Sequence, residues 1–161
     1  MTFAVNRLAD EDVEAAVALW HEVGLTRPWN DPHRDLARAR ETWPDLVLAV
    51  HDGPRLVGTV VAGFDGHRGW LYYLATVPDR QGEGIASTLV SEAERRLGDL
   101  GCPKVQLMVR ADNAKTALPT RCCGRGVARP SRAARGLKLR IRCETGDDHH
   151  VAPHAGAWIE T

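Results

Sequence analysis

The pattern of apolar and polar positions predicts a strand, a turn and a helix in the middle of the chain. Residues 71–77 are almost continuously apolar or aromatic, which is typical of a central strand covered on both faces. Pro78 and Asp79 end this run. Apolar positions then recur every three or four residues and predict a helix whose inner face carries Ile85, Leu89, Ala93, Leu97 and Leu100.

The neighbouring parts of the chain divide into similar segments. Their patterns predict strands over residues 3–7, 46–50 and 56–64, a helix between residues 10 and 24, and a shorter helix over residues 36–43. Apolar and polar residues alternate over 105–109, which predicts a strand with one covered and one wetter face. The resulting order is β-α-α-β-β-β-α-β, an α/β (α+β) arrangement.

Two glycines stand at the entrance of the helix that begins near residue 85, in the string Gln81, Gly82, Glu83, Gly84. Glycine permits a tight turn and leaves the amide N–H groups without side chains in front of them. Such amides, at the positive end of a helix dipole, form a binding site for a pyrophosphate. The alternative is an ordinary turn in which the glycines serve only geometry.

The spacing Gln81-x-x-Gly84-x-Ala86 resembles the acetyl-CoA signature of the GNAT family of N-acetyltransferases. It differs from a Walker loop, which has a Lys-Ser/Thr pair, and from the spacing Gly-x-Gly-x-x-Gly. The order of elements also resembles this family, over residues 1–113. Within the family, the strings at residues 27–31, 65–69 and 101–104 are most similar to YpeA-type acetyltransferases.

The resemblance implies a mixed central sheet flanked by helices and a direct transfer of acetyl from acetyl-CoA to a primary amine, without a covalent enzyme intermediate. It implies that the strands over 71–77 and 105–109 splay apart, so that backbone groups of Ala75, Thr76 and Val77 pair with the pantetheine and meet the oxyanion. The implied pyrophosphate site comprises Gln81, Gly82, Glu83, Gly84, Ile85, Ala86 and Ser87. Asn113 matches the family asparagine that contacts the CoA arm.

Candidates for the acceptor side lie in two loops and on the central strand. They are Trp29, Asn30, Asp31, Asp65, His67 and Tyr72. Asp31 can attract a cationic amine beside the ring of Trp29, but Asn30 to Pro32 also fits a helix cap followed by proline in the first turn. Tyr72 and Tyr73 are predicted to point to opposite faces, so that one enters the cleft, unless both are core aromatics.

The resemblance stops after Ala114. The family continues with a helix that carries a tyrosine in the string Phe/Leu-Tyr-Glu-x-Leu-Gly, and this tyrosine usually protonates the thiolate. Residues 116–124 contain no tyrosine, so the general acid is unknown, and the family's C-terminal helix and last two strands are predicted to be missing or disordered. A catalytically impaired acyl-CoA-binding remnant is therefore the alternative function. The expected division is a core over 1–113 and a basic tail over 114–161.

A frameshift is one hypothesis for this change. Residues 119–123 can be encoded by codons that, read two bases later, give Tyr-Glu-Val-Leu, which resembles the family string. Resequencing of the source DNA tests this, because a clean read without an alternative family-like frame contradicts it. Loss of the last strands would also expose residues 105–109 as a sheet edge, which predicts poor solubility or a homo-oligomer.

Charge and cysteine content bear on whether the protein binds nucleic acid, a membrane or a metal, and on where in the cell it is located. Lys plus Arg and Asp plus Glu both number 21, so the zero net charge favours neither nucleic acid nor membrane. Residues 115–142 carry nine Lys or Arg and no acid, and nucleic-acid binding there is a third hypothesis. No apolar run approaches the length of a membrane span and the N-terminus lacks a signal-peptide layout, so a cytoplasmic location is expected. The thiols of Cys102, Cys122, Cys123 and Cys143 are expected to be reduced. A metal site of His149, His150 and His154 with one of Cys122, Cys123 or Cys143 would fit no standard zinc spacing, so no metal is expected.

Overall fold

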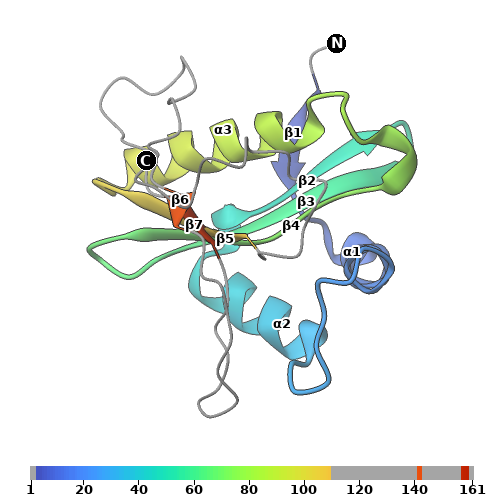
Figure 1. Ribbon diagram of the computed structural model, residues 1–161, viewed down its shortest axis with the longest axis horizontal. Helices are drawn as coiled ribbons and strands as arrows, with labels where there is room; N and C mark the ends of the chain where they lie inside the picture. Colours follow the sequence, from blue (N-terminus) through green and yellow to red (C-terminus); the bar gives the residue numbers. More distant parts are fainter. Residues whose placement is uncertain (1–2, 110–140, 143–156, 160–161) are drawn as a thin grey trace.

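A central sheet with helices on both faces organises the part of the chain that the computed structural model describes, residues 3–109, 141–142 and 157–159 (Figure 1). The helices are α1 (Val13–Glu22), α2 (Pro32–Thr42) and α3 (Ile85–Asp99), with short 3-10 turns at Asp10–Asp12, Pro44–Leu46 and Pro78–Arg80. The strands are β1 (Val5–Arg7), β2 (Val47–Asp52), β3 (Arg55–Phe64), β4 (Gly69–Thr76), β5 (Val105–Val109), β6 (Ile141–Arg142) and β7 (Ala157–Ile159).

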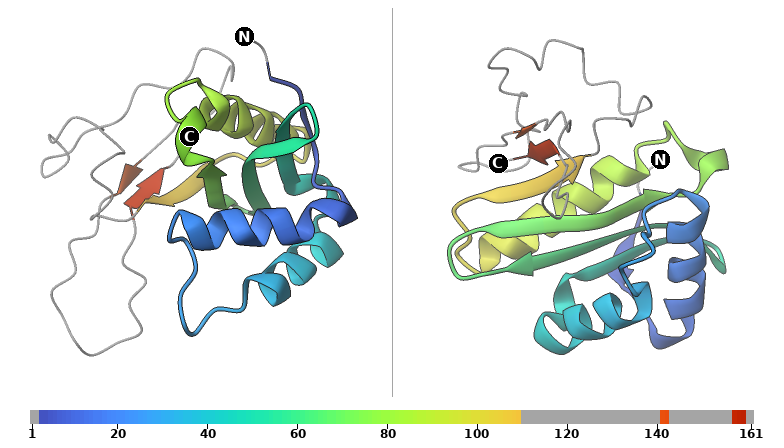
Figure 2. Two further views of the ribbon diagram at one scale, coloured as in Figure 1. Left: turned by 90° about the vertical axis from the view of Figure 1, so that its right-hand side faces the viewer. Right: turned by 60° about the horizontal axis from the view of Figure 1, so that its bottom comes forward.

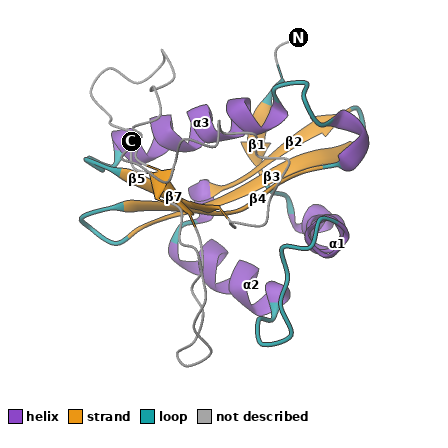
Figure 3. Cartoon of the chain, viewed as in Figure 1, coloured by secondary structure: helices purple, strands orange, loops and turns teal. Residues whose placement is uncertain are grey.

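The strand order is β1-β2-β3-β4-β5-β7-β6. The first four strands are antiparallel neighbours, whereas β4 and β5 are parallel and are connected through α3. α1 and α2 cover one face of the sheet and α3 covers the other (Figures 2 and 3). The predicted element order and the mixed sheet flanked by helices are therefore confirmed.

One part of the core lies where α3 packs on β3 and β4, and another lies under α1 and α2. Four of the five apolar positions predicted for the inner face of α3 are fully buried, namely Ile85, Leu89, Ala93 and Leu97, while Leu100 follows the helix end and is 44% exposed. α3 approaches β3 so closely at Gly58 that a Cβ there would lie 2.6 Å from Ile85 Cγ2. This packing fixes the N-terminus of α3 against the sheet.

β4 contains a bulge. Tyr72 pairs with Val61 and Ala75 with Thr59, so Tyr73 and Leu74 both oppose the single residue between them on β3. Tyr73 has a φ of 52°, the left-handed region that non-glycine residues rarely adopt.

The bulge corrects the prediction that Tyr72 and Tyr73 point to opposite faces. Both rings lie on the α1 and α2 face, with centroids 6.1 Å apart. An extra residue in the strand shifts the alternation of side chains by one position, which single-sequence periodicity does not register.

The structure describes two short strands where the sequence predicted that the last two strands would be missing or disordered. β7 pairs antiparallel with β5 at Val109↔Ala157, and β6 pairs with β7. An unpaired edge offers free backbone donors and acceptors, and the apolar string Ala157–Ile159 satisfies those at the end of β5. Asn113, the suspected frameshift and most of the predicted tail lie outside the described residues. No helix in the described ranges is both long and apolar enough to cross a membrane.

Candidate functional site

β4 and β5 separate after a short paired stretch. Their parallel register runs only from Gly69↔Val105 to Leu71↔Leu107. From Tyr72 to Thr76, β4 continues with β3 as its only partner among the described strands. The divergence therefore begins one residue before the bulge at Tyr73 and leaves one edge of β4 unpaired by β5.

Backbone groups at the end of β4 alternate in direction. The Val77 N–H donates to the Val57 carbonyl at 3.0 Å, toward β3. Because alternate residues of an antiparallel strand point their N–H and C=O to opposite sides, those of Thr76 point away from β3. Of the three residues expected to offer backbone groups to a ligand, only Thr76 directs both groups to the side where β5 has diverged. Ala75 and the N–H of Val77 face β3, which corrects the prediction for these two residues.

The loop before α3 has a backbone that favours glycine. Gly82 has a φ of 89°, and Gly84, the residue before the first turn of α3, has a φ of 87°. A Cβ at either glycine would meet no atom within 4 Å, so their left-handed backbone, not crowding, favours glycine. The first turn of α3 carries no acidic residue. These features fit an anion at the helix N-terminus, because the amides and the helix dipole face it and the first turn of α3 carries no carboxylate.

Ion pairs connect the loop before α3 to the β2–β3 hairpin and to itself. Arg80 Nε lies 2.8 Å from Glu83 Oε1, and the Arg80 guanidinium also pairs with Asp52 at the end of β2. Arg55 of β3 binds Asp79 through two hydrogen bonds of 2.7 and 2.8 Å. These contacts tie residues 79–83 to the β2–β3 hairpin and hold the loop in place before a ligand arrives.

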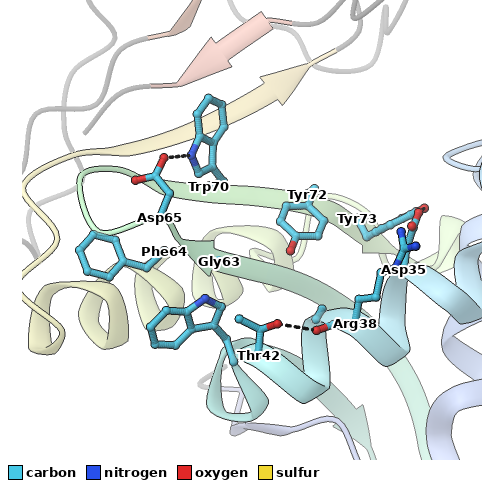
Figure 4. A pocket seen from close by; sticks show the side chains of 11 residues that line it. Asp35, Arg38, Thr42, Gly63, Phe64, Asp65, Trp70, Tyr72 and Tyr73 are labelled. Atoms are coloured by element: carbon cyan, nitrogen blue, oxygen red, sulfur yellow. Dashed lines mark hydrogen bonds between the residues drawn. The ribbon is translucent and has the colours of Figure 1, made fainter.

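A pocket of about 510 Å³ lies on the face of the sheet that α2 covers, opposite α3. It is formed between α2, the end of β3 and the first half of β4 (Figure 4). This volume is in the range of small-molecule sites. The lining residues are Asp35, Arg38, Ala39, Thr42, Trp43, Gly63, Phe64, Asp65, Trp70, Tyr72 and Tyr73. Because Tyr72 directly follows the last β4 residue that pairs with β5, the pocket borders the divergence of the two strands.

Four elements meet at Tyr73. Its ring stacks on Trp20 of α1 at a centroid distance of 4.2 Å, and its hydroxyl donates to Asp35 Oδ2 of α2 at 2.8 Å. The indole N–H of Trp20 donates to Thr59 Oγ1 of β3 at 2.8 Å, and this hydroxyl donates to the Tyr73 carbonyl at 3.3 Å. The Asn30 side chain also hydrogen-bonds to Tyr73. These contacts therefore stabilise the bulge through both the side chain and the backbone carbonyl of Tyr73.

Both tyrosines stay protonated at neutral pH. Burial and the nearby charge of Asp35 raise the pKa of Tyr72. Burial and the hydrogen bond to Asp35 raise the pKa of Tyr73 further. The two phenols are therefore hydrogen-bond donors at the pocket.

Asp65 organises the turn between β3 and β4. Its Oδ1 accepts from the backbone N–H of His67 at 2.8 Å and of Arg68 at 2.6 Å, and its Oδ2 accepts from Trp70 Nε1 at 3.0 Å. These three bonds, the one from Trp70 first, lower the pKa of Asp65 from 3.8 to about 2. Asp65 thus fixes the ring of Trp70 at the pocket (Figure 4).

The lowered pKa predicts how Asp65→Asn changes acid stability. The folded-state pKa of Asp65 is below its ordinary value of 3.8, so its carboxylate stabilises the fold above about pH 4, and this contribution disappears as pH falls toward 2. We expect the melting temperature of Asp65→Asn to be lower than that of the parent protein at pH 5 and to converge with it near pH 2. A difference that stays constant from pH 5 to pH 2 contradicts this assignment.

The six acceptor candidates are divided by the structure. Tyr72 and Asp65 line the pocket, and Asn30 contacts Tyr73 at its edge. Trp29 is 69% exposed and is not among the lining residues. Asp31 caps α2 by accepting from the N–H groups of His33 and Arg34, with Pro32 in the first turn, as the capping interpretation predicted. His67 lies in the turn held by Asp65, outside the pocket lining.

Sequence reasoning missed the contribution of α2 to the pocket. Asp35, Arg38, Ala39 and Thr42 recur at spacings of three and four residues and therefore share one helix face. That face mixes charged and small residues, so it resembles a solvated surface in the sequence. Among the described residues, no group of three or more His, Cys, Asp or Glu side chains is placed to hold a metal ion.

The sequence pattern of the acetyltransferase (GNAT) family matches residues 11–124. The chain belongs to this family. Its curated relatives include an acetyltransferase of Pectobacterium atrosepticum, 48% identical over 103 residues, which are 64% of this chain and 73% of the relative. An acetyltransferase of Sodalis glossinidius is 47% identical over 103 residues, 64% of this chain and 72% of that protein.

Solved structures share the fold of this GNAT protein. Ard1 from Thermoplasma volcanium has a TM-score of 0.68 at 14% identity and covers 99% of this chain and 96% of its own. The ribosomal-protein-S18-alanine N-acetyltransferase from Escherichia coli has a TM-score of 0.62 at 17% identity, covering 98% and 90%. The NatC complex bound to Gag peptide and CoA has a TM-score of 0.65 at 19% identity, covering 99% and 96%. At these identities the likeness concerns the fold.

Proposed function

We propose that this GNAT protein transfers an acetyl group from acetyl-CoA to a primary amine by direct attack of the amine. The observation that carries the proposal is the placement of two sites on one strand. The glycine loop at the N-terminus of α3 follows β4, and the pocket opens where β4 leaves β5. A donor held along the free edge of β4 and an acceptor held in the pocket would meet at the bulge.

The residues for the donor are those that fit an extended, diphosphate-bearing ligand. The open amides at Gly82 and Gly84 and the first turn of α3 would hold the pyrophosphate, and the outward N–H and C=O of Thr76 would pair with an amide of the pantetheine arm. When bound, acetyl-CoA supplies the activated thioester carbonyl that an amine can attack. A backbone N–H on this edge of the bulged strand would donate to the negative charge that develops on the carbonyl oxygen.

Tyr72 Oη is our candidate proton donor. The family tyrosine is absent from residues 116–124, and Tyr72 is a protonated phenol in the pocket beside the divergence of β4 and β5. Tyr73, the other tyrosine of the chain, has its hydroxyl bound to Asp35. A positioned proton donor contributes about 10²–10⁴-fold to rate.

Calorimetry with CoA and a thiol-release assay with a panel of primary amines test the proposal. We expect CoA binding, amine-dependent thiol release, and a fall in kcat of about 10²-fold in Tyr72→Phe with unchanged CoA affinity. The matched Tyr73→Phe variant makes the same chemical change but keeps the Tyr72 phenol; it removes the bond to Asp35, so it should lower stability and reduce kcat less than Tyr72→Phe does. CoA binding without thiol release from any amine would favour the acyl-CoA-binding remnant.

A further inference from the structure

The side chains of the pocket point to the charge of the acceptor. Two carboxylates, Asp35 and Asp65, line it together with the rings of Trp70, Tyr72 and Tyr73. We propose that the pocket binds an amine carrying a second, non-reacting positive charge, of which a short aliphatic diamine is the simplest example. This inference rests on the proposed acetyl transfer and names its acceptor class.

A carboxylate that does not itself take the proton would hinder the reaction if it lay beside the attacking amine. The attacking nitrogen must be neutral, and a nearby negative charge favours its protonated form. Acidic residues in an acceptor pocket are therefore better suited to a group that keeps its charge during the reaction. A second ammonium, separated from the attacking nitrogen by several carbons, is such a group.

Asp35 has capacity to bind this ammonium. Its Oδ2 accepts the hydroxyl of Tyr73 at 2.8 Å, while its Oδ1 accepts no hydrogen bond from the described residues. Asp35 is half-buried on α2, so its charge is only partly screened by water. The Tyr73 bond also fixes the direction of the carboxylate.

The aromatic rings are held in fixed orientations. Asp65 Oδ2 accepts from Trp70 Nε1 at 3.0 Å, and Tyr72 meets Tyr73 edge to face at a centroid distance of 6.1 Å. Ring faces attract an ammonium, most strongly when the site excludes water. Figure 4 shows these side chains around one hollow, with Asp35 and Asp65 on different sides of it.

Arg38 is the opposing charge. It lies one turn after Asp35 on α2, is exposed, and forms no ion pair with any residue in the described part of the chain. If Arg38 governed recognition, the preferred acceptor would carry a carboxylate. The proposal therefore has a definite rival in the same pocket.

Three primary amines with a chain of four carbon atoms separate these cases: 1,4-diaminobutane, butylamine and 4-aminobutanoate. We expect kcat/KM for the diamine to exceed that for butylamine by about tenfold or more, and 4-aminobutanoate to be the poorest. In Asp35→Asn the ratio of diamine to butylamine should fall close to one. Glu41→Gln makes the same kind of change on the same helix outside the pocket lining and should leave the ratio intact.

The outcomes are distinct. Preference for 4-aminobutanoate, or equal use of the three amines, overturns the diamine proposal. A ratio that Asp35→Asn does not change also overturns it. Because butylamine turnover reports acetyl transfer itself, the inference can fail while the proposed function stands. Absence of thiol release with all three amines overturns both.

Discussion

Gly84→Val is expected to weaken CoA binding by about 10- to 100-fold, because hydrogen bonds to a charged group are worth about 1.5–3 kcal/mol. Gly84 has a φ of 87° and lies immediately before α3. A β-branched residue disfavours that φ and drives the loop toward another backbone, which turns the amides away from a common point. The branched side chain would also stand over the open space that now borders the glycine. Calorimetry with CoA measures the loss.

Gly101→Val provides the matched control. Gly101 lies at the opposite end of α3, has a φ of 79°, and would also meet no atom within 4 Å of an added Cβ. The two substitutions therefore impose similar backbone strain, of about 1–2 kcal/mol, and should lower the melting temperature comparably. Only Gly84→Val should reduce CoA affinity. Equal CoA affinities for both variants and the parent protein would remove the basis of the pyrophosphate site.

The strand, loop and helix over residues 71–100 could be predicted from the sequence because each is determined by local patterns. A continuous apolar run, two glycines and a repeat of three to four residues encode a buried strand, a turn and an amphipathic helix without reference to distant residues. The buried face of α3 agrees with that pattern up to Leu97. The fold class followed from the order of such segments.

The pocket depends on contacts that the sequence pattern does not contain. Arg38 lies in the helix that the sequence predicted over residues 36–43, and Asp35 directly precedes that range, but their neighbours on β4 are more than 30 positions away. The two tyrosines were noticed, yet their common direction depends on a bulge and on a positive φ at Tyr73. Neither property has a signature in one sequence, since tyrosine is not a residue that favours the left-handed region.

Trp20→Ala is expected to destabilise the protein by about 3–5 kcal/mol and to reduce acetyl transfer beyond the loss of folded protein. Trp20 is fully buried, stacks on Tyr73, and binds the Thr59 hydroxyl that contacts the Tyr73 carbonyl. Its removal leaves a cavity and frees the bulge to return to a regular strand, which would turn Tyr73 away from the α2 face. Urea unfolding and kcat/KM per folded molecule measure the two effects.

Thr59→Val and Leu46→Ala separate packing from positioning. Thr59→Val keeps the side-chain shape but leaves the buried indole N–H of Trp20 without its acceptor, at a cost of about 1–3 kcal/mol. Leu46→Ala removes a buried side chain of the turn before β2, outside the pocket lining, at a cost of about 2–5 kcal/mol. We expect Thr59→Val to lower kcat/KM of the folded fraction and Leu46→Ala to leave it unchanged. If both variants lose stability but keep their kcat/KM, the hydrogen bonds around Tyr73 contribute only to the stability of the fold and do not position the bulge for catalysis.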